Sequence, residues 1–170
     1  YICMLSSFQI NNNYSILMRI FLSLFIFTSL VSSQINPNNI DIVRDEYGVP
    51  HIFAETDAEV AFGLAWANAE DDFKTIQEAY LAGNALLSKH IGIKGAPADF
   101  ITQFIGSREL IDRNINEISQ DYMKVISGYA EGLNSYAQKN PDKVLFKKLF
   151  PITPKMMMMY SHCLLYTSDA

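Results

Sequence analysis

Cysteine, glycine, proline and basic residues are all scarce in this chain of 170 residues, and each shortage excludes a class of protein. Two cysteines, Cys3 and Cys163, cannot build a disulfide scaffold. Eight glycines and six prolines exclude a collagen-like or low-complexity chain. With 13 basic against 18 acidic residues the net charge is −5, so no nucleic-acid partner is expected. The hydrophobic share of 49% instead predicts one globular domain.

The chain also lacks the residue spacings that mark common active sites. It contains no GxSxG elbow and no phosphate-binding loop. Its three histidines, His51, His90 and His162, are far apart and have no metal-ligand spacing. We interpret His51 as a hydrogen-bonded structural residue on a strand. The acidic residues 70–72 are contiguous, so their side chains diverge on a helix, which favours a solvated face or an interchain salt bridge.

Residues 18–33 have the pattern of a secretory signal peptide. A basic residue precedes an apolar run at residues 20–31, and small residues follow, which places the cleavage between Ser33 and Gln34. Twelve helical residues span about 18 Å, short of the ~30 Å hydrocarbon core, so an uncleaved membrane anchor is the weaker alternative. Residues 1–17 are then expected to be untranslated upstream sequence. We expect a periplasmic or secreted protein with no membrane attachment after cleavage.

Residues 162–170 have the pattern of an artefact of DNA sequencing. The letters CLLYTSDA at residues 163–170 resemble one reading frame of a sequencing-library adapter. We therefore expect the natural sequence to be interrupted at about Ser161, and we assign residues 34–161 to the exported protein. A short polar tail is the alternative. Neither cysteine lies within residues 34–161, so no disulfide is expected there.

Residues 40–54 predict a β-hairpin. Apolar and polar residues alternate before a turn that contains Gly48, and residues 49–54 form the second strand. Pro50 has no amide hydrogen, so it belongs at the start of a strand or at an edge. A two-stranded hairpin is marginally stable alone, so we expect it to pack on a larger structure.

A long helix is predicted directly after the hairpin. Thr56 and Glu59 make a capping box, and the apolar pattern continues to about Leu81. Gly63 weakens the interior of this helix by about 1 kcal/mol relative to alanine, which indicates close packing of another backbone there.

Two more helices are predicted further along the chain. Asp99 is expected to cap a helix that extends to about Arg113. The apolar residues of that helix are Phe100, Phe104, Leu110 and Ile111. Ser119 or Asp121 begins a helix that Pro141 ends. One face of this last helix contains Tyr122, Val125, Ile126, Tyr129, Leu133, Tyr136 and Ala137. We interpret the tyrosine-rich part of that face as core rather than as a ligand-binding surface.

Three segments resemble sequence blocks of the penicillin acylase family. They read IVRDEYGVPHI at residues 42–52, FGLAWANAED at residues 62–71 and ISGYAEGLN at residues 126–134, in the family's order. On these blocks the chain is identified as a member of that family, as an N-terminal precursor fragment with part of the α chain. The Ala-Glu-Asp ending of the second block is similar to the acyl-homoserine lactone and aculeacin acylase branch.

The resemblance implies an exported N-terminal-nucleophile hydrolase. Its fold class is α+β: this chain supplies the N-terminal part of an αββα sandwich, a β-hairpin followed mostly by α-helices. Such precursors cut themselves into an α chain and a β chain, whose N-terminal serine hydrolyses the amide bond of small N-acyl substrates. The expected partner is therefore the chain's own β chain. No catalytic, cofactor-binding or metal residue is carried over to this chain, and calcium is expected only of the full-length enzyme.

The residues that match the family blocks are interpreted as scaffold. They are Arg44, Asp45, Gly48, Pro50, His51, Gly63, Asp71, Gly128 and Asn134. The predicted hairpin and amphipathic helices lack a second layer to pack against, so they make up only half of an αββα sandwich. Residues 34–161 alone are therefore not expected to fold cooperatively. The main alternative is a non-catalytic secreted helical binding module that uses the tyrosine-rich helix as its contact surface. A membrane-anchored protein that keeps residues 20–31 is a further alternative.

Overall fold

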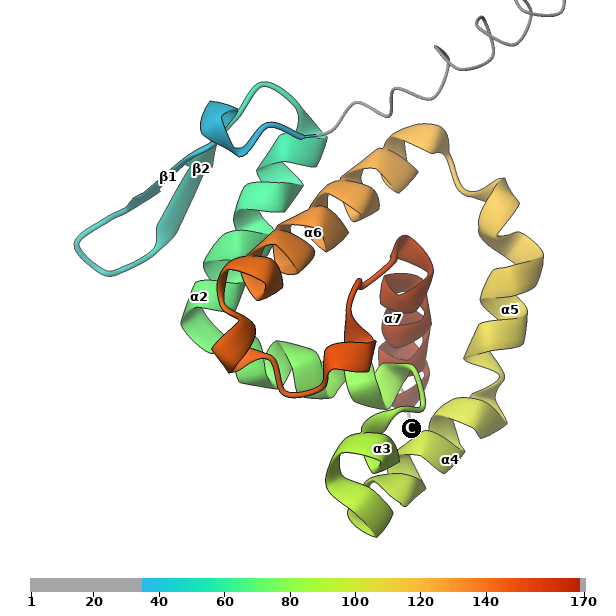
Figure 1. Cartoon of the computed structure of the whole chain (residues 1–170). Coiled ribbons are helices and arrows are strands. Elements are labelled where there is room, and N and C mark those ends of the chain that lie inside the picture. The colour runs from blue at the N-terminus through green and yellow to red at the C-terminus, as the bar shows by residue number, and fades with distance from the viewer. Residues whose placement is uncertain (1–34, 169–170) are drawn as a thin grey trace, which may run out of the picture. The chain divides into compact units, whose positions relative to one another are not determined.

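The computed structural model describes residues 35–168. The predicted signal peptide, its cleavage position at Ser33 and Gln34, and the upstream residues 1–17 lie outside the described residues. Within the described part, one hairpin is followed by helices and turns, so the fold is α+β as predicted (Figure 1). The strands and α-helices are β1 (Asp41–Arg44), β2 (Pro50–Phe53), α2 (Asp57–Gly83), α3 (Leu87–Ile91), α4 (Ala96–Ile105), α5 (Ser107–Asn114), α6 (Gln120–Lys139) and α7 (Pro154–Ser168). The 3₁₀ turns are η2 (Pro37–Asn39), η3 (Gly92–Gly95), η4 (Ile115–Glu117), η5 (Pro141–Lys143) and η6 (Lys147–Leu149).

The hairpin forms where the sequence predicts it. Strands β1 and β2 pair antiparallel, with Ile42 opposite Ile52 and Arg44 opposite Pro50. Pro50 is the first residue of β2, in agreement with its missing amide hydrogen. The hairpin packs on the first half of α2 through Ile52 and through Ile40, which precedes β1.

Helix α2 begins with the predicted capping box and contains a kink that was not predicted. The Thr56 hydroxyl accepts from the Glu59 amide, and the Glu59 carboxylate accepts from the Thr56 amide at 3.0 Å. At Asp72 the backbone leaves the helical region, with φ −153° and ψ 73°. The Asp72 carboxylate accepts from the Thr75 amide at 3.0 Å, so it caps the second half of the helix.

Helices α2 and α6 lie against each other through glycines (Figure 1). A Cβ atom at Gly128 would lie 2.1 Å from the Ala58 carbonyl oxygen, and one at Gly132 would lie 2.4 Å from that of Phe62. Close backbone packing therefore occurs at these two positions. The prediction of backbone packing at Gly63 is wrong in detail, because a Cβ there would meet the side chains of Ile52 and Ile40.

The core lies between α2, α6 and the segment that leads into α7. Tyr136 contacts Trp66 and Phe73 edge to face, with ring centroids 5.1 and 5.0 Å apart. Leu133 and Tyr136 are buried and Tyr129 is half-buried, so the tyrosine-rich face of α6 is core as predicted. The other fully buried apolar side chains of this core include Leu81, Leu149 and Ile152.

The predicted single helix from Asp99 to Arg113 is two helices, and Asp99 is not its cap. The chain turns at Gly106, where φ is +72°, a conformation that favours glycine. Asp99 lies inside α4, and its carboxylate accepts from the amides of Leu87 and Ser88 at 2.8 and 2.9 Å. Asp99 therefore caps α3, the helix before its own.

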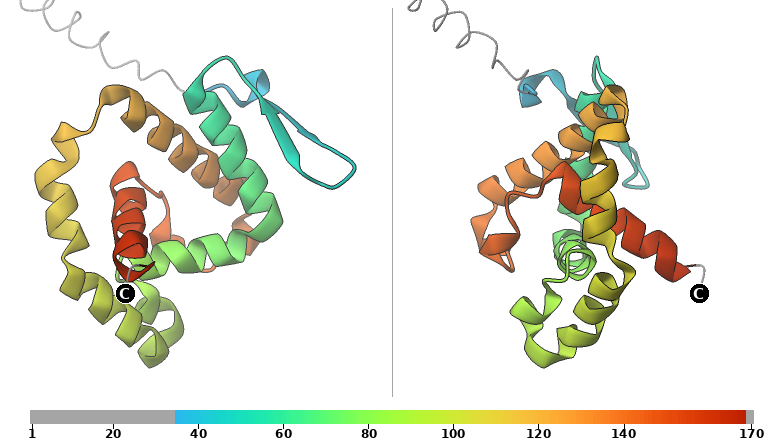
Figure 2. Two further views of the ribbon diagram at one scale, coloured as in Figure 1. Left: turned by 180° about the vertical axis from the view of Figure 1, so that it is seen from behind. Right: turned by 90° about the vertical axis from the view of Figure 1, so that its right-hand side faces the viewer.

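Helix α7 continues through residues 162–168 without a break at Ser161 (Figure 2). In the described part of this stretch, the His162 Nδ1 atom lies 2.9 Å from the Ser107 hydroxyl. The origin of residues 162–170 in a sequencing adapter stays a prediction. Among residues 35–168, no helix combines the length and apolar character needed to cross a membrane.

Candidate functional site

Arg44 connects the first family block to the second. Its Nη1 atom donates to the Gly48 carbonyl at 2.8 Å, and its Nη2 atom forms ion pairs with Asp71 at 2.8 Å and Glu70 at 3.4 Å. The hydrogen bond with Asp71, followed by the pair with Glu70, raises the pKa of Arg44 despite partial desolvation. The acidic run at residues 70–72 is thus an exposed face, and two of its three residues pair with Arg44 of the same chain.

Asp45 organises the turn of the hairpin. One carboxylate oxygen accepts from the amides of Tyr47 and Val49, both at 2.9 Å, and the other lies 3.4 Å from His51 Nε2. The hydrogen bond from Val49 is the largest cause of a lowered pKa at Asp45. Gly48 completes the turn with φ +81°. His51 therefore makes the kind of hydrogen bond that its interpretation as a structural residue requires.

Asn134, at the end of the third block, holds the segment that precedes α7. Its side-chain amide donates to the Ile152 carbonyl at 2.9 Å and accepts from the Ile152 amide at 2.7 Å. The adjacent Phe150–Pro151 peptide bond is cis. Through its two hydrogen bonds with Ile152, Asn134 fixes an irregular stretch of backbone.

Two further polar residues with the same role were not predicted. The buried Gln77 donates to the Lys143 carbonyl at 3.0 Å and accepts from the Leu145 amide at 2.8 Å. The buried Asn84 donates to the Met156 carbonyl at 3.1 Å. Gln77 lies on the apolar stripe of α2 together with Phe73, Tyr80 and Leu81, and Asn84 is the C-cap residue directly after this helix. A polar residue on or next to such a stripe is the signal that identifies them.

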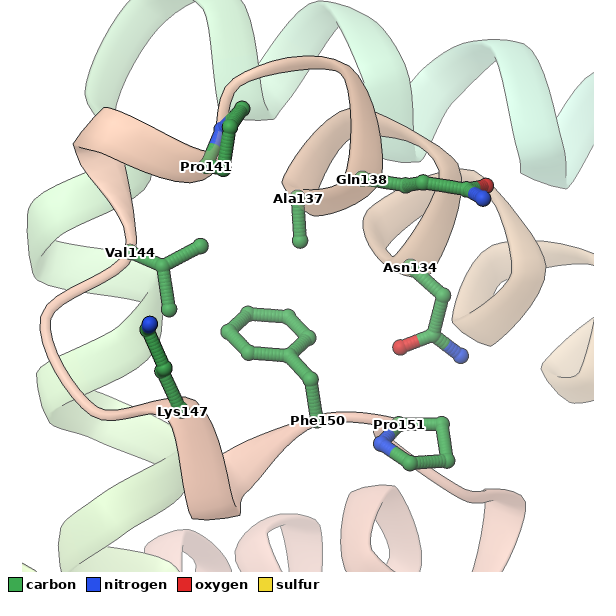
Figure 3. A pocket seen from close by; sticks show the side chains of 8 residues that line it. All are labelled: Asn134, Ala137, Gln138, Pro141, Val144, Lys147, Phe150 and Pro151. Carbon is green, nitrogen blue, oxygen red and sulfur yellow. The ribbon is translucent and has the colours of Figure 1, made fainter.

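The irregular stretch held by these residues borders an apolar hollow (Figure 3). The hollow has a volume of about 420 Å³. Its lining residues are Asn134, Ala137, Gln138, Pro141, Val144, Lys147, Phe150 and Pro151. Figure 3 shows the Phe150 ring between Val144 and Ala137, with the polar ends of Lys147 and Gln138 at the border. This arrangement suits an apolar group and supplies no nucleophile.

The acidic side chains of the described residues are spread out or occupied by partners within the chain. No three His, Cys, Asp or Glu side chains within residues 35–168 come together as metal ligands. Asp71 and Glu70 share an ion pair with Arg44, and the Asp99 carboxylate is occupied by amides of α3 and by the Ser88 hydroxyl. Calcium binding by the full-length enzyme stays a prediction.

The serine–histidine contact between α5 and α7 is not an exposed nucleophile. Ser107, which lies 2.9 Å from His162 Nδ1, is fully buried at the start of α5. A substrate carbonyl has no access to a hydroxyl in that position. The described residues thus contribute a packed core and an apolar hollow.

The family model described as penicillin amidase matches residues 39–165, well over half of the chain. The chain belongs to the penicillin amidase family. All three sequence blocks of this family member lie inside the matched range. The ion pair between Arg44 and Asp71 joins the first block to the second.

The penicillin amidase family member is similar to acylases of several specificities. Penicillin G acylase of Escherichia coli is 28% identical over 85% of this chain and 18% of the relative. The acyl-homoserine lactone acylase PvdQ of Pseudomonas fluorescens is 25% identical over 66% of this chain and 16% of the relative. Aculeacin-A acylase of Actinoplanes utahensis is 34% identical over 45% of this chain and 10% of the relative. The chain thus spans less than a fifth of the length of these relatives, and its family is one of amide hydrolases.

A solved structure supports the fold. Thermostable penicillin G acylase from Alcaligenes faecalis matches with a TM-score of 0.66 and 23% identity, over 77% of this chain and 75% of that chain. The arrangement of hairpin and helices therefore matches the fold of most of that chain.

Proposed function

We propose that this chain is the N-terminal part of the α chain of an exported, self-processing amidohydrolase that cleaves N-acyl compounds. The observation that carries the proposal is the family match over residues 39–165. The structural match, which covers 75% of a penicillin G acylase chain, agrees with it. The same chain covers only 18% of the Escherichia coli relative, so most of the enzyme lies outside it. The proposed partner is the β chain of the same precursor.

In the proposed reaction, the nucleophile is the serine at the N-terminus of the β chain. Its α-amine takes the hydroxyl proton as the oxygen attacks the amide carbonyl, and hydrogen-bond donors hold the oxyanion. The C–N bond breaks, the proton leaves with the amine, and water then releases the acyl group as a carboxylic acid. An α-amine suits this role because it titrates near neutral pH.

The proposed contribution of this chain is structural support. Asp45 shapes the hairpin and Arg44 ties it to α2. Gly128 lets α6 lie against the α2 backbone, and Asn134 fixes the segment that leads into α7. Tyr136 is buried and the Tyr129 hydroxyl accepts from Asn68 at 3.0 Å, so these two tyrosines of α6 support the core of the chain.

The proposed substrates are N-acyl amides of the types named for the relatives: penicillin G, an acyl-homoserine lactone and aculeacin A. Specificity among them depends on contacts in the acyl pocket. Export to the periplasm or beyond is proposed from the signal pattern at residues 18–33.

Amine release tests this proposal. The complete polypeptide that contains this chain is incubated with penicillin G, N-decanoyl-homoserine lactone and aculeacin A, and the free amine is measured with fluorescamine. The account predicts amine release from at least one substrate, and loss of release after treatment with a sulfonyl fluoride that blocks serine. A folded protein that releases amine from none of the three contradicts the proposal.

A further inference from the structure

Helix α4 packs against the rest of the chain through its polar side. Its buried side chains are Asp99 and Thr102, which are 5% and 4% exposed. Asp99 accepts hydrogen bonds from the amides of Leu87 and Ser88, and the Thr102 hydroxyl donates to the Ala82 carbonyl at 2.9 Å. Hydrogen bonds to α2 and α3 therefore fix which side of α4 faces outward.

The outward side of α4 is apolar. Phe100, Ile101 and Phe104 are 68%, 47% and 81% exposed, and their spacing places them on one side of the helix. The rings of Phe100 and Phe104 stack with centroids 6.1 Å apart. Ile93, in the η3 turn that packs on α4, is 85% exposed. We refer to Phe100, Ile101 and Phe104 as the α4 face.

The distribution of polar and apolar side chains on α4 is the reverse of that on an ordinary surface helix. Such a helix normally buries its apolar stripe and presents polar residues to water. The only charged residue of α4 is Asp99, and it is buried. A continuous exposed apolar surface of this kind marks an interaction site.

We propose that the α4 face is covered by the remainder of the acylase polypeptide, as part of the contact between the α and β chains. This inference rests on the proposed function, because the chain spans 18% of the Escherichia coli relative and most of that polypeptide lies outside it. Because the remainder of the polypeptide is made as part of the same precursor, one copy of it is available to cover each α4 face from synthesis onward. Permanent interfaces of this kind are the more apolar ones, whereas a surface that is free for part of the time needs polar residues.

Side-chain footprinting of the complete protein tests the proposal without any measurement of activity. Hydroxyl radicals oxidise exposed phenylalanine, and the oxidation of Phe100 and Phe104 is compared before and after denaturation. The proposal predicts several-fold slower oxidation of both residues in the native protein. Oxidation of Phe104 at the rate expected from its exposure in this chain overturns it. Protection that disappears on dilution to monomer also overturns it, because the occupant is then a second copy.

A matched pair of variants provides an independent test. Phe104→Glu places a charge on the α4 face, whereas Gln103→Glu places the same charge on the preceding residue, about 100° around the helix from Phe104. Phe104→Glu is expected to lower the recovery of associated α and β chains about tenfold, and Gln103→Glu to leave it unchanged. Equal recovery for the two variants overturns the proposal. Absence of amine release in the wild-type protein contradicts the proposed function. It does not affect the footprinting or the recovery of associated chains, because neither measurement depends on activity.

Discussion

At the scale of single residues, side-chain amides hold the irregular backbone between α6 and α7. Gln77 binds backbone atoms of Lys143 and Leu145, and Asn134 binds both backbone groups of Ile152. The sequence shows these residues as polar positions near apolar stripes, but it does not show their partners. Those partners are 18 to 68 residues away along the chain, so only the packed structure reveals them.

Among the glycines, Gly128 leaves the least room for a side chain, and it provides a prediction at this scale. Gly128→Ala places a Cβ atom 2.1 Å from the Ala58 carbonyl oxygen, so α2 and α6 have to separate. We expect a loss of about 3 kcal/mol in the free energy of unfolding, as for an overpacked core. The urea midpoint of the complete protein, followed by circular dichroism, measures this loss.

Gly48→Ala is the control for that substitution. Gly48 has φ +81° but nothing within 4 Å of a Cβ atom, so only backbone strain of about 1–2 kcal/mol is expected. If Gly128→Ala is no more destabilising than Gly48→Ala, the close contact between α2 and α6 is not present in the protein.

At the scale of elements, the hairpin, α2 and α6 were predictable because their signals are local. Thr56 and Glu59 are three residues apart, and Ser119 caps α6 by accepting from the Tyr122 amide. Helix α4 was predicted wrongly for the opposite reason. Phe100 has the spacing of a core residue, but buried hydrogen bonds of Asp99 turn it outward, and those bonds come from a preceding helix.

The turn of the hairpin predicts a pH dependence. Hydrogen bonds, chiefly from Val49, lower the pKa of Asp45, so its ionised form stabilises the folded turn. That contribution is present above the ordinary carboxyl pKa of about 3.9 and is lost as the pH falls through the lower folded value. Deuterium uptake of residues 41–53, corrected for intrinsic exchange, is therefore expected to rise relative to α6 below about pH 4.

Asp45→Ala is the reference for that measurement. At neutral pH its hairpin is expected to exchange faster than that of the wild-type protein, and the difference is expected to shrink in acid as the wild-type carboxylate becomes protonated. A difference between the two proteins that is the same at pH 7 and in acid contradicts the assigned role of Asp45.

At the scale of the whole molecule, the sequence identified the family but not the surface that the chain presents. The three blocks at residues 42–52, 62–71 and 126–134 are contiguous segments that can be read directly, and they lie within the matched range. The α4 face and the apolar hollow depend on packing between distant segments. No catalytic residue of this chain was assigned from the sequence.

The exposed α4 face and the two-stranded hairpin predict the behaviour of the isolated segment. Residues 34–161, produced alone, are expected to unfold gradually with heat. In this isolated segment no other part of the enzyme covers Phe100 and Phe104 or pairs with the edges of the hairpin. Circular dichroism and intrinsic fluorescence are expected to give transitions that do not coincide. A single sharp transition seen by both probes contradicts this prediction.

The central claim is that this chain is part of the shorter chain of a self-processed amidohydrolase. Intact mass spectrometry and N-terminal sequencing of the complete, purified protein test this claim most directly. The account predicts two associated chains: a shorter one that begins at Gln34 and contains the hairpin, α2 and α6, and a longer one that begins with serine. A single uncleaved chain in a folded preparation that releases amine from an N-acyl substrate contradicts it.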